Sequence, residues 1–146
     1  MPARHALYFA PAEGSDLEAL GRHWLGRCPR TGAETPQPEV PGIAPERLAE
    51  LTAPPRHYGF HGTLKPPFAL RAGIDEHRIR EAARRFAARR APFALPPLKL
   101  ATIGSFVALV PSAPSAELEE LAADCVMLFD GFRAPPPPAE VEKRRA

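Results

Sequence analysis

Cysteine, lysine and long apolar runs are all scarce in this sequence of 146 residues. The two cysteines, Cys28 and Cys125, lie far apart and lack metal-site spacing. This excludes a disulfide-rich mini-protein and indicates free thiols in a reducing compartment. No apolar run approaches the roughly 18 residues of a membrane-spanning helix, and no basic-then-apolar leader opens the chain. We therefore expect a cytoplasmic protein with no membrane partner.

Several motifs for phosphate binding and nucleophilic catalysis are absent too. The sequence contains no Gly-x-x-x-x-Gly-Lys loop, no Gly-x-Gly-x-x-Gly turn, no Gly-x-Ser-x-Gly elbow and no Cys-x-x-Cys pair. The formal net charge is only +2, so no strong field is built in. By motif, the sequence therefore does not support a P-loop nucleotide hydrolase, a dinucleotide-binding oxidoreductase or a serine hydrolase of the α/β type.

Proline, in contrast, is abundant, with 20 prolines among 146 residues against an ordinary usage of about 5%. Seven of them fall within residues 28–55, where only 45–52 has a helical pattern and Pro45 stands at a tolerated first position. Connections of this length usually carry function or are mobile. We expect a folded domain over 1–132, followed by a Pro-rich, charged tail over 133–146.

Hydrophobic spacing, capping residues and turn signals predict the regular elements. Gly104 and Ser105 separate two β-like runs and predict a two-residue hairpin loop. The expected order is strand 5–10, helix 16–26, helix 45–52, strand 56–65 with a short extended piece at 68–71, helix 75–90, strands 98–103 and 106–110, and helix 115–129. Mixed strands and helices with a hairpin indicate an α+β fold, with antiparallel sheets flanked by helices.

The expected strand 56–65 has one polar face and one apolar face. Side chains alternate along a strand, which places a polar set on one side: His57, His61, Thr63 and Lys65. The opposite side then carries Tyr58, Phe60 and Leu64. A strand with this pattern is typical of the floor of a polar cleft.

The spacing of His61 and Thr63 suits the binding of one phosphate. Two residues along a strand span roughly 6.6 Å between Cα atoms, so imidazole and hydroxyl can reach different oxygens of one group. Histidine titrates near neutral pH and both donates and accepts protons, and a threonine hydroxyl donates to a phosphoryl oxygen. Lys65 adds a positive charge for the same anion. His57 and His61, roughly 13 Å apart on such a strand, are poorly placed to bind one metal.

The block of residues 54–68, PPRHYGFHGTLKPPF, resembles the first signature of the 2H phosphoesterase superfamily, which includes 2′-5′ RNA ligase-like and cyclic phosphodiesterase-like proteins. It is most similar to the uncharacterised, DUF1045-like branch associated with phosphonate metabolism. The resemblance extends along nearly the whole chain, through HALYFAP at 5–11, GRHWLG at 21–26, GSFVALVP at 104–111 and LFDGFRAPP at 128–136.

The resemblance implies a two-lobed fold in which two His-x-Thr motifs face each other across a cleft. One histidine then serves as base and the other as acid, the hydroxyl residues hold the phosphate, and no metal or other cofactor is needed. Typical substrates are cyclic phosphodiesters or 2′-5′ linkages of nucleotides and RNA ends, and a ribose cyclic phosphate is one candidate here. On this basis His61 and Thr63 are the expected catalytic residues. Tyr8 is expected to form a wall for the sugar or base, and His57 and Lys65 also to bind substrate.

The second His-x-Thr motif is missing from this sequence. After Lys65 the only further histidine is His77, which is followed by Arg-Ile and opens a helix. This suggests a C-terminal truncation, an incomplete second lobe and impaired turnover.

Two alternatives remain open. One is a non-catalytic module that binds phosphates, nucleotides or RNA ends. The other is a half-domain that needs a second chain or forms a homodimer through an open sheet edge.

Overall fold

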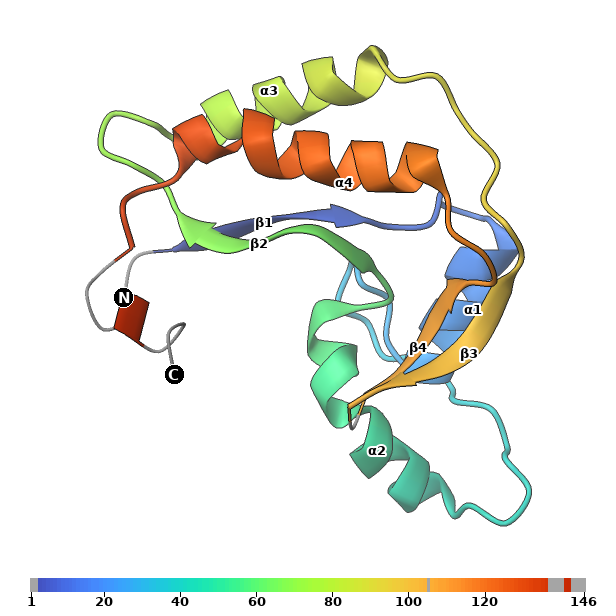
Figure 1. Cartoon of the computed structure of the whole chain (residues 1–146). Helices are drawn as coiled ribbons and strands as arrows, with labels where there is room; N and C mark the ends of the chain where they lie inside the picture. The colour runs from blue at the N-terminus through green and yellow to red at the C-terminus, as the bar shows by residue number, and fades with distance from the viewer. Residues whose placement is uncertain (1–2, 105, 137–140, 143–146) are drawn as a thin grey trace. The chain divides into compact units, whose positions relative to one another are not determined.

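The computed structural model describes residues 3–104, 106–136 and 141–142. Its elements are β1 (Arg4–Phe9), α1 (Asp16–Leu25), α2 (Pro45–Tyr58), β2 (Gly62–Ala69), α3 (Glu76–Ala88), β3 (Leu98–Ile103), β4 (Phe106–Pro111) and α4 (Ala116–Leu128), with a short 3-10 helix at Asp130–Phe132. The strands pair as β1 with β2 and β3 with β4, and each pair is antiparallel (Figure 1). The expected α+β class with antiparallel sheets is confirmed.

Capping residues explain why several helices begin and end where the sequence predicts. The Ser15 side chain accepts a hydrogen bond from the Glu18 amide, and Asp75 accepts one from the Arg78 amide. Each thereby satisfies one of the free N–H groups in a first helical turn. Gly26 ends α1 in the left-handed conformation at φ 68°. The expected helices 16–26, 75–90 and 115–129 are therefore confirmed to within a few residues.

The chain divides into two compact units. Unit 1 contains residues 1–7 and 64–146, and unit 2 contains residues 8–63. The expected division into a domain over 1–132 and a tail over 133–146 stays a prediction. Within the expected polyproline run, Pro137 and Pro138 lie outside the described residues.

Unit 1 is held together by an apolar core. Phe68 of β2, Ile79 of α3 and Phe129 at the end of α4 are buried against one another. The rings of Phe86 and Phe129 meet edge to face with centroids 5.6 Å apart, and Leu7 of β1 packs on the same cluster. Helices α3 and α4 therefore cover one face of the unit 1 strands (Figure 1).

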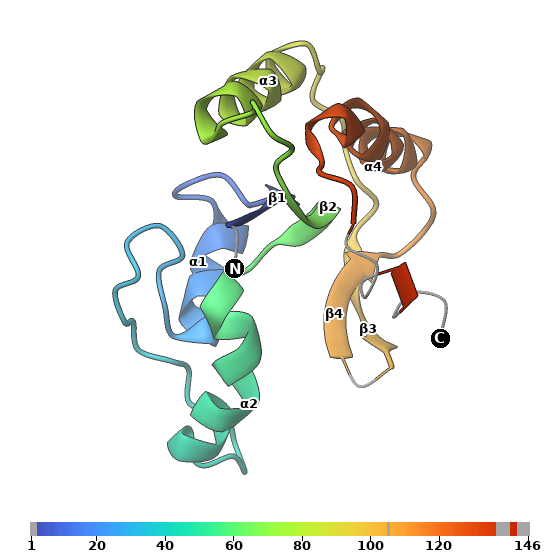
Figure 2. The same cartoon turned by 90° about the vertical axis from the view of Figure 1, so that its left-hand side faces the viewer.

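The hairpin of β3 and β4 forms a separate ribbon within unit 1 (Figure 2). Ile103 pairs with Phe106 next to the expected two-residue turn, where Gly104 has φ 61°. Leu100 and Val107 are more than half exposed, at 74% and 63%. The hairpin is confirmed, and its strands do not extend the β1–β2 pair among the described residues.

Unit 2 combines helices α1 and α2 with the Pro-rich connection between them. Leu25 and Leu48 are buried, and so is the polar Thr52. Gly21 of α1 lies against Phe60 so closely that a Cβ there would stand 2.5 Å from the Phe60 Cβ. This contact explains why a glycine occupies the middle of a helix despite its cost. The same contact buries part of Phe60, one of the three residues assigned to the apolar side of residues 56–65.

The predicted strand 56–65 is wrong at its beginning, because α2 continues to Tyr58 and β2 begins only at Gly62. Proline inside a helix removes a backbone hydrogen bond, and the predicted helix 45–52 accordingly ends before Pro54 and Pro55. Side-chain bonds connect the residues before and after these prolines. The Thr52 hydroxyl donates to the Leu48 carbonyl at 2.8 Å, and Arg56 Nη2 donates to Thr52 Oγ1 at 3.1 Å.

The extended piece expected at 68–71 is instead the second half of β2, which runs through Pro66 and Pro67 to Ala69. Proline is tolerated in a strand whose N–H side has no ladder partner. Leu70 forms an isolated bridge with Arg133. No helix in the described part of the chain combines the length and apolarity required to span a membrane.

Candidate functional site

The candidate site begins where α2 gives way to β2. Gly59 ends the helix with its N–H donating to the Pro55 carbonyl at 3.0 Å, and its φ of 79° and ψ of 176° are essentially restricted to glycine. A Cβ at this position would also lie 2.6 Å from the Pro29 Cβ. Both observations require glycine here, and the resulting sharp turn sets the direction in which the next residues leave the helix.

His61 follows this turn and is fixed by it. Its Nδ1 lies 2.8 Å from the Gly59 carbonyl oxygen. A carbonyl oxygen only accepts hydrogen bonds, so Nδ1 carries a proton in this arrangement. The neutral ring then has its lone pair on Nε2, the nitrogen that remains for exchange of a proton with another molecule. The side chain is half-buried, which restricts its orientation while leaving it accessible.

Two tyrosine rings lie close to the ring of His61. The Tyr8 ring lies 3.9 Å from the His61 ring between centroids, with a tilt of 35°. The Tyr58 ring lies 6.3 Å from it, and the His57 ring meets Tyr58 edge to face at 4.8 Å. Tyr8 is 37% exposed and Tyr58 60%. The arrangement offers flat, partly exposed ring surfaces beside a histidine that can transfer a proton.

Four of the five predicted site residues belong to unit 2, namely Tyr8, His57, His61 and Thr63. Tyr8 comes from β1 and contacts His61 directly, as the expected wall requires. Thr63 is the second residue of β2, two positions after His61, and it is exposed. Whether these residues act on a substrate stays a prediction.

The prediction that His57 and His61 lie on the same face of one strand is wrong. His57 lies in the last turn of α2 and is exposed, because the helix continues past the two prolines. It reaches the neighbourhood of His61 only through Tyr58, on whose ring it packs. The strand alternation that placed these two histidines together does not apply to a helical residue.

Lys65 also departs from the expected polar face. Its side chain is buried in unit 1, where Nζ donates to the Val126 carbonyl at 2.9 Å and lies 3.4 Å from the Asp130 carboxylate. The ammonium also lies 5.3 Å from the Phe68 ring centroid. Strand periodicity could not show that α4 covers this side of β2. A lysine with these partners is a structural group rather than an exposed charge for a substrate.

Neighbouring charges act on the carboxylate that pairs with Lys65. The Arg133 guanidinium donates to Asp130 at 2.7 Å, and this hydrogen bond, with a smaller contribution from Lys65, lowers the pKa of Asp130 below its usual value. In unit 2 the Thr31 hydroxyl and nearby amides lower the pKa of the Cys28 thiol. Burial raises the pKa of the Cys125 thiol in α4.

Sequence reasoning missed three residues that shape the site. It placed Tyr58 on the opposite face from His61, and it assigned no role to Gly59 or to Arg27. Arg27 Nη1 donates to the carbonyls of Arg56 and His57, at 3.4 and 3.2 Å, and so satisfies the last carbonyls of α2. The available signal was Gly59 inside the predicted strand 56–65, because an isolated glycine in a strand pattern often marks a bulge or a close backbone approach. Arg27 is 30 residues from its partner His57, and nothing in the sequence links them.

Taken together, these features define an α+β protein in which a glycine turn presents a His-x-Thr sequence beside aromatic rings. Residues 63–146 match the family described as "Protein of unknown function (DUF1045)". This match covers more than half of the chain, which therefore belongs to that family. It begins at Thr63, so His61 and Tyr8 lie outside the matched range.

Curated relatives extend the similarity over both units. The chain is 40% identical over 142 residues to a protein of Janthinobacterium sp. (strain Marseille) named "Ribose 1,5-bisphosphate phosphokinase PhnN", covering 97% of this chain and 31% of that protein. It is 35% identical over 134 residues to a protein of the same name from Laribacter hongkongensis (strain HLHK9), covering 92% of this chain and 32% of that protein. The chain thus spans about a third of the length of these relatives. No solved structure matches it.

Proposed function

We propose that this chain carries the His-x-Thr part of a metal-independent phosphoesterase of the 2H type, which acts on a small cyclic phosphodiester of a ribose or nucleotide. One observation carries the proposal: the hydrogen bond from His61 Nδ1 to the Gly59 carbonyl, which leaves Nε2 as the proton-exchanging nitrogen. A histidine of fixed tautomer and restricted orientation is what general acid–base catalysis requires.

The neutral His61 ring is suited to the role of base. Nε2 takes a proton from a water molecule as the water oxygen attacks phosphorus, and one phosphorus–oxygen bond of the cyclic diester breaks. The departing sugar oxygen then needs a proton from an acid. In the superfamily that this chain resembles, the second His-x-Thr motif supplies that acid, and this sequence contains only one such motif.

Thr63 and Tyr8 have complementary roles in this proposal. The exposed Thr63 hydroxyl donates to a phosphoryl oxygen, two residues along the chain from the histidine. Tyr8 packs on His61 and offers the remainder of its ring to the sugar or base of the substrate. The exposed Tyr58 ring extends the same surface.

The names of the relatives favour a phosphorylated ribose among the candidate substrates. Both are named for ribose 1,5-bisphosphate, and a ribose cyclic phosphate of phosphonate breakdown belongs to the same chemical class. Their names also specify a kinase. Because the sequence of this chain contains no P-loop, we do not extend that reaction to it.

A single acid–base histidine limits the expected rate. A positioned acid or base contributes typically about 10²–10⁴-fold, so the loss of one partner leaves slow turnover. The second candidate function is therefore binding without turnover, through the same histidine, threonine and aromatic rings. The observation that favours it is the single His-x-Thr motif in this sequence.

Phosphorus NMR of the chain with 2′,3′-cyclic nucleotides and a ribose cyclic phosphate, in the presence of a chelator, tests the proposal. We expect slow conversion to the monoester, which His61→Ala abolishes without a change in melting temperature. His23→Ala, at an exposed histidine of α1, is the matched control and should leave the rate unchanged.

The two candidate functions give different results in a parallel titration. Saturable binding of a cyclic nucleotide, weakened by salt and lost in His61→Ala, with no product, identifies a binding module. Neither binding nor turnover of any of these compounds by the folded chain contradicts both candidates. Rapid hydrolysis that His61→Ala leaves intact contradicts the role of His61.

A further inference from the structure

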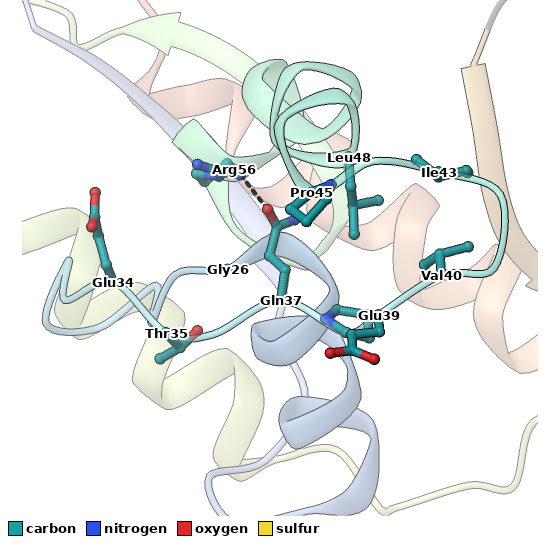
Figure 3. Close-up of a pocket in the computed structure, with 11 residues that line it drawn as sticks. Gly26, Glu34, Thr35, Gln37, Glu39, Val40, Ile43, Pro45, Leu48 and Arg56 are labelled. Atoms are coloured by element: carbon teal, nitrogen blue, oxygen red, sulfur yellow. Dashed lines mark hydrogen bonds between the residues drawn. The ribbon is translucent and has the colours of Figure 1, made fainter.

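Unit 2 contains a cavity separate from the His61 site. It has a volume of about 500 Å³ and lies between the connection at residues 34–43 and helix α2 (Figure 3). Val40, Ile43 and Leu48 supply an apolar wall, and Arg56 supplies a positive charge. Neither His61, Thr63 nor Tyr8 lines it. Its size falls within the range of about 300–1,000 Å³ that is typical of small-molecule sites.

Arg56 contributes a charge that no acidic group balances. Its Nη2 donates to Gln37 Oε1 at 2.9 Å, to Thr52 Oγ1 at 3.1 Å and to the Ala49 carbonyl at 3.4 Å, and all three acceptors are neutral. Its Nε is buried and has no hydrogen-bond partner. Over the described ranges, no carboxylate forms an ion pair with this guanidinium. A partly buried cation in this state favours a negatively charged partner.

Two carboxylates, those of Glu34 and Glu39, also line the cavity, and neither lies within ion-pair distance of Arg56. Figure 3 shows the Gln37 side chain pointing toward Arg56, while both carboxylates lie apart from that contact. Gln37 is itself held by a bond from Nε2 to the Trp24 carbonyl at 2.8 Å. Gln37 and the positively charged Arg56 guanidinium are therefore held in place at one end of the cavity.

We propose that this cavity binds a small organic anion. A carboxylate or phosphate oxygen of the ligand accepts hydrogen bonds from the Arg56 guanidinium, and the apolar body of the ligand packs on Val40, Ile43 and Leu48. Charge-assisted bonds to a guanidinium are among the strongest polar contacts that proteins form. The apolar wall adds area that a free inorganic ion cannot use. This site is independent of the function proposed for His61.

Titration of the isotope-labelled full chain with matched small probes tests the proposal. Phenyl phosphate and benzoate share an aromatic body and differ in the anion, benzyl alcohol has a similar body without charge, and inorganic phosphate has the charge without the body. We expect saturable amide shifts at Gln37, Val40, Ile43 and Leu48 with one or both organic anions. We expect binding at least 10-fold weaker with benzyl alcohol and with inorganic phosphate.

Variants then separate the guanidinium from general electrostatics. Arg56→Gln should weaken the preferred anion at least 10-fold, whereas Arg56→Lys, which keeps the charge, should retain more of the affinity. Arg47→Gln is the matched control, because Arg47 is an exposed arginine of the same helix that pairs with Glu50. It should leave the affinity unchanged.

A second variant avoids the structural bonds of Arg56. Ile43→Glu places a negative charge at the partly exposed rim and should abolish anion binding while the melting temperature is retained. The proposal is overturned if no probe shifts the cavity amides, if benzyl alcohol binds as tightly as the anions, or if Arg47→Gln and Arg56→Gln weaken binding equally. A preference for phenyl phosphate identifies a phosphate ligand, and a preference for benzoate identifies a carboxylate.

Discussion

The interiors of the two units are built in different ways. Unit 1 buries Phe68, Ile79 and Phe129 in one large apolar cluster, and beside it the hydrogen-bonded ammonium of Lys65. Unit 2 buries the smaller pair Leu25 and Leu48, and beside them a polar group, Thr52, which is tied to the Gln37 and Arg56 side chains. Apolar burial is insensitive to direction, whereas hydrogen bonds fix geometry.

This difference matters because the candidate site lies in the unit that is held by directional contacts. The orientation of His61 depends on its hydrogen bond to the Gly59 carbonyl, and the position of that carbonyl depends on the turn at Gly59. This turn follows the end of α2, where Arg27 donates to the last carbonyls of the helix. Substitutions that change the volume of a buried side chain should therefore destabilise unit 1 most. Substitutions that remove a hydrogen bond or alter the backbone direction should destabilise unit 2 most.

The largest expected effect is on the core of unit 1. Phe129→Ala removes a ring that is 2% exposed and contacts Phe86 and Phe132. We expect a loss of about 3–5 kcal/mol in the free energy of unfolding, measured by denaturant titration. Met127→Ala, at an exposed residue of the same helix, is the control and should change it by less than about 0.5 kcal/mol. Equal losses would contradict the assignment of the core to Phe129.

The next effect concerns the turn before His61. Gly59→Ala combines a left-handed backbone with a contact of 2.6 Å to Pro29, so we expect a cost of about 1–3 kcal/mol together with a change in the His61 ring nitrogen shifts by NMR. Gly42→Ala is a close control, because Gly42 has φ 80° and nothing within 4 Å of an added Cβ. It should cost less and leave the His61 signals unchanged. Unchanged His61 signals in Gly59→Ala would contradict the claim that the turn at Gly59 fixes the orientation of the His61 ring.

A third test examines the outer surface of unit 1, where apolar residues are not covered. A two-stranded hairpin is marginal in water, and Leu100 and Val107 are exposed on this one. We propose that its open edge pairs with a second copy of the chain, and expect light scattering to show a mass that rises with concentration. Leu100→Lys should give a monomer. Lys99→Arg, at an exposed residue of the same strand, is the control and should keep the mass of the wild type. A wild-type chain that is monomeric at every concentration contradicts the pairing.

The smallest expected effect is the pH dependence of the Asp130 cluster. Because Arg133 and Lys65 lower the pKa of Asp130, the unfolded chain binds a proton more readily than the folded one. The stabilisation is thus present above the unfolded pKa, about 3.9, and is lost as pH falls through the lower folded value. The free energy of unfolding of Asp130→Asn, measured by denaturant titration, should be lower than that of the wild type at pH 7. The two values should converge as the pH falls. Glu13→Gln, at an exposed carboxylate, should show no such convergence.

The elements that could be predicted from sequence are those whose signals are local. The helix at 75–90 has its cap at Asp75 and an apolar stripe, and the hairpin has its two-residue turn, so each could be recognised without the rest of the fold. The strand that carries Tyr8 could be predicted in the same way. Its role as a wall for the substrate comes from the resemblance and stays a prediction, and the structure shows its ring against that of His61.

The elements that were missed depend on contacts that are distant in the sequence. Helix α2 passes its two prolines with the help of side-chain bonds, among them one to Gln37, which lies 19 residues before Arg56. Lys65 is buried by a helix that begins about 50 residues later. The spacing of polar and apolar residues shows which side chains share a face of a strand, but not which other elements cover that face. The predicted polar face of 56–65 therefore includes His57 and Lys65.

The order of residues in the two units has a consequence for synthesis. Unit 2 is one continuous stretch, whereas unit 1 joins residues 1–7 to residues that begin at 64. A ribosome therefore releases all of unit 2 before any of α3 or α4, and the first strand must wait for its partner. Early folding of unit 2 shortens the flexible loop between β1 and β2, and so lowers the entropy lost when they pair. Folding of the segment that contains His61 thus also favours the pairing of the two separate stretches of unit 1, residues 1–7 and those from 64 onward.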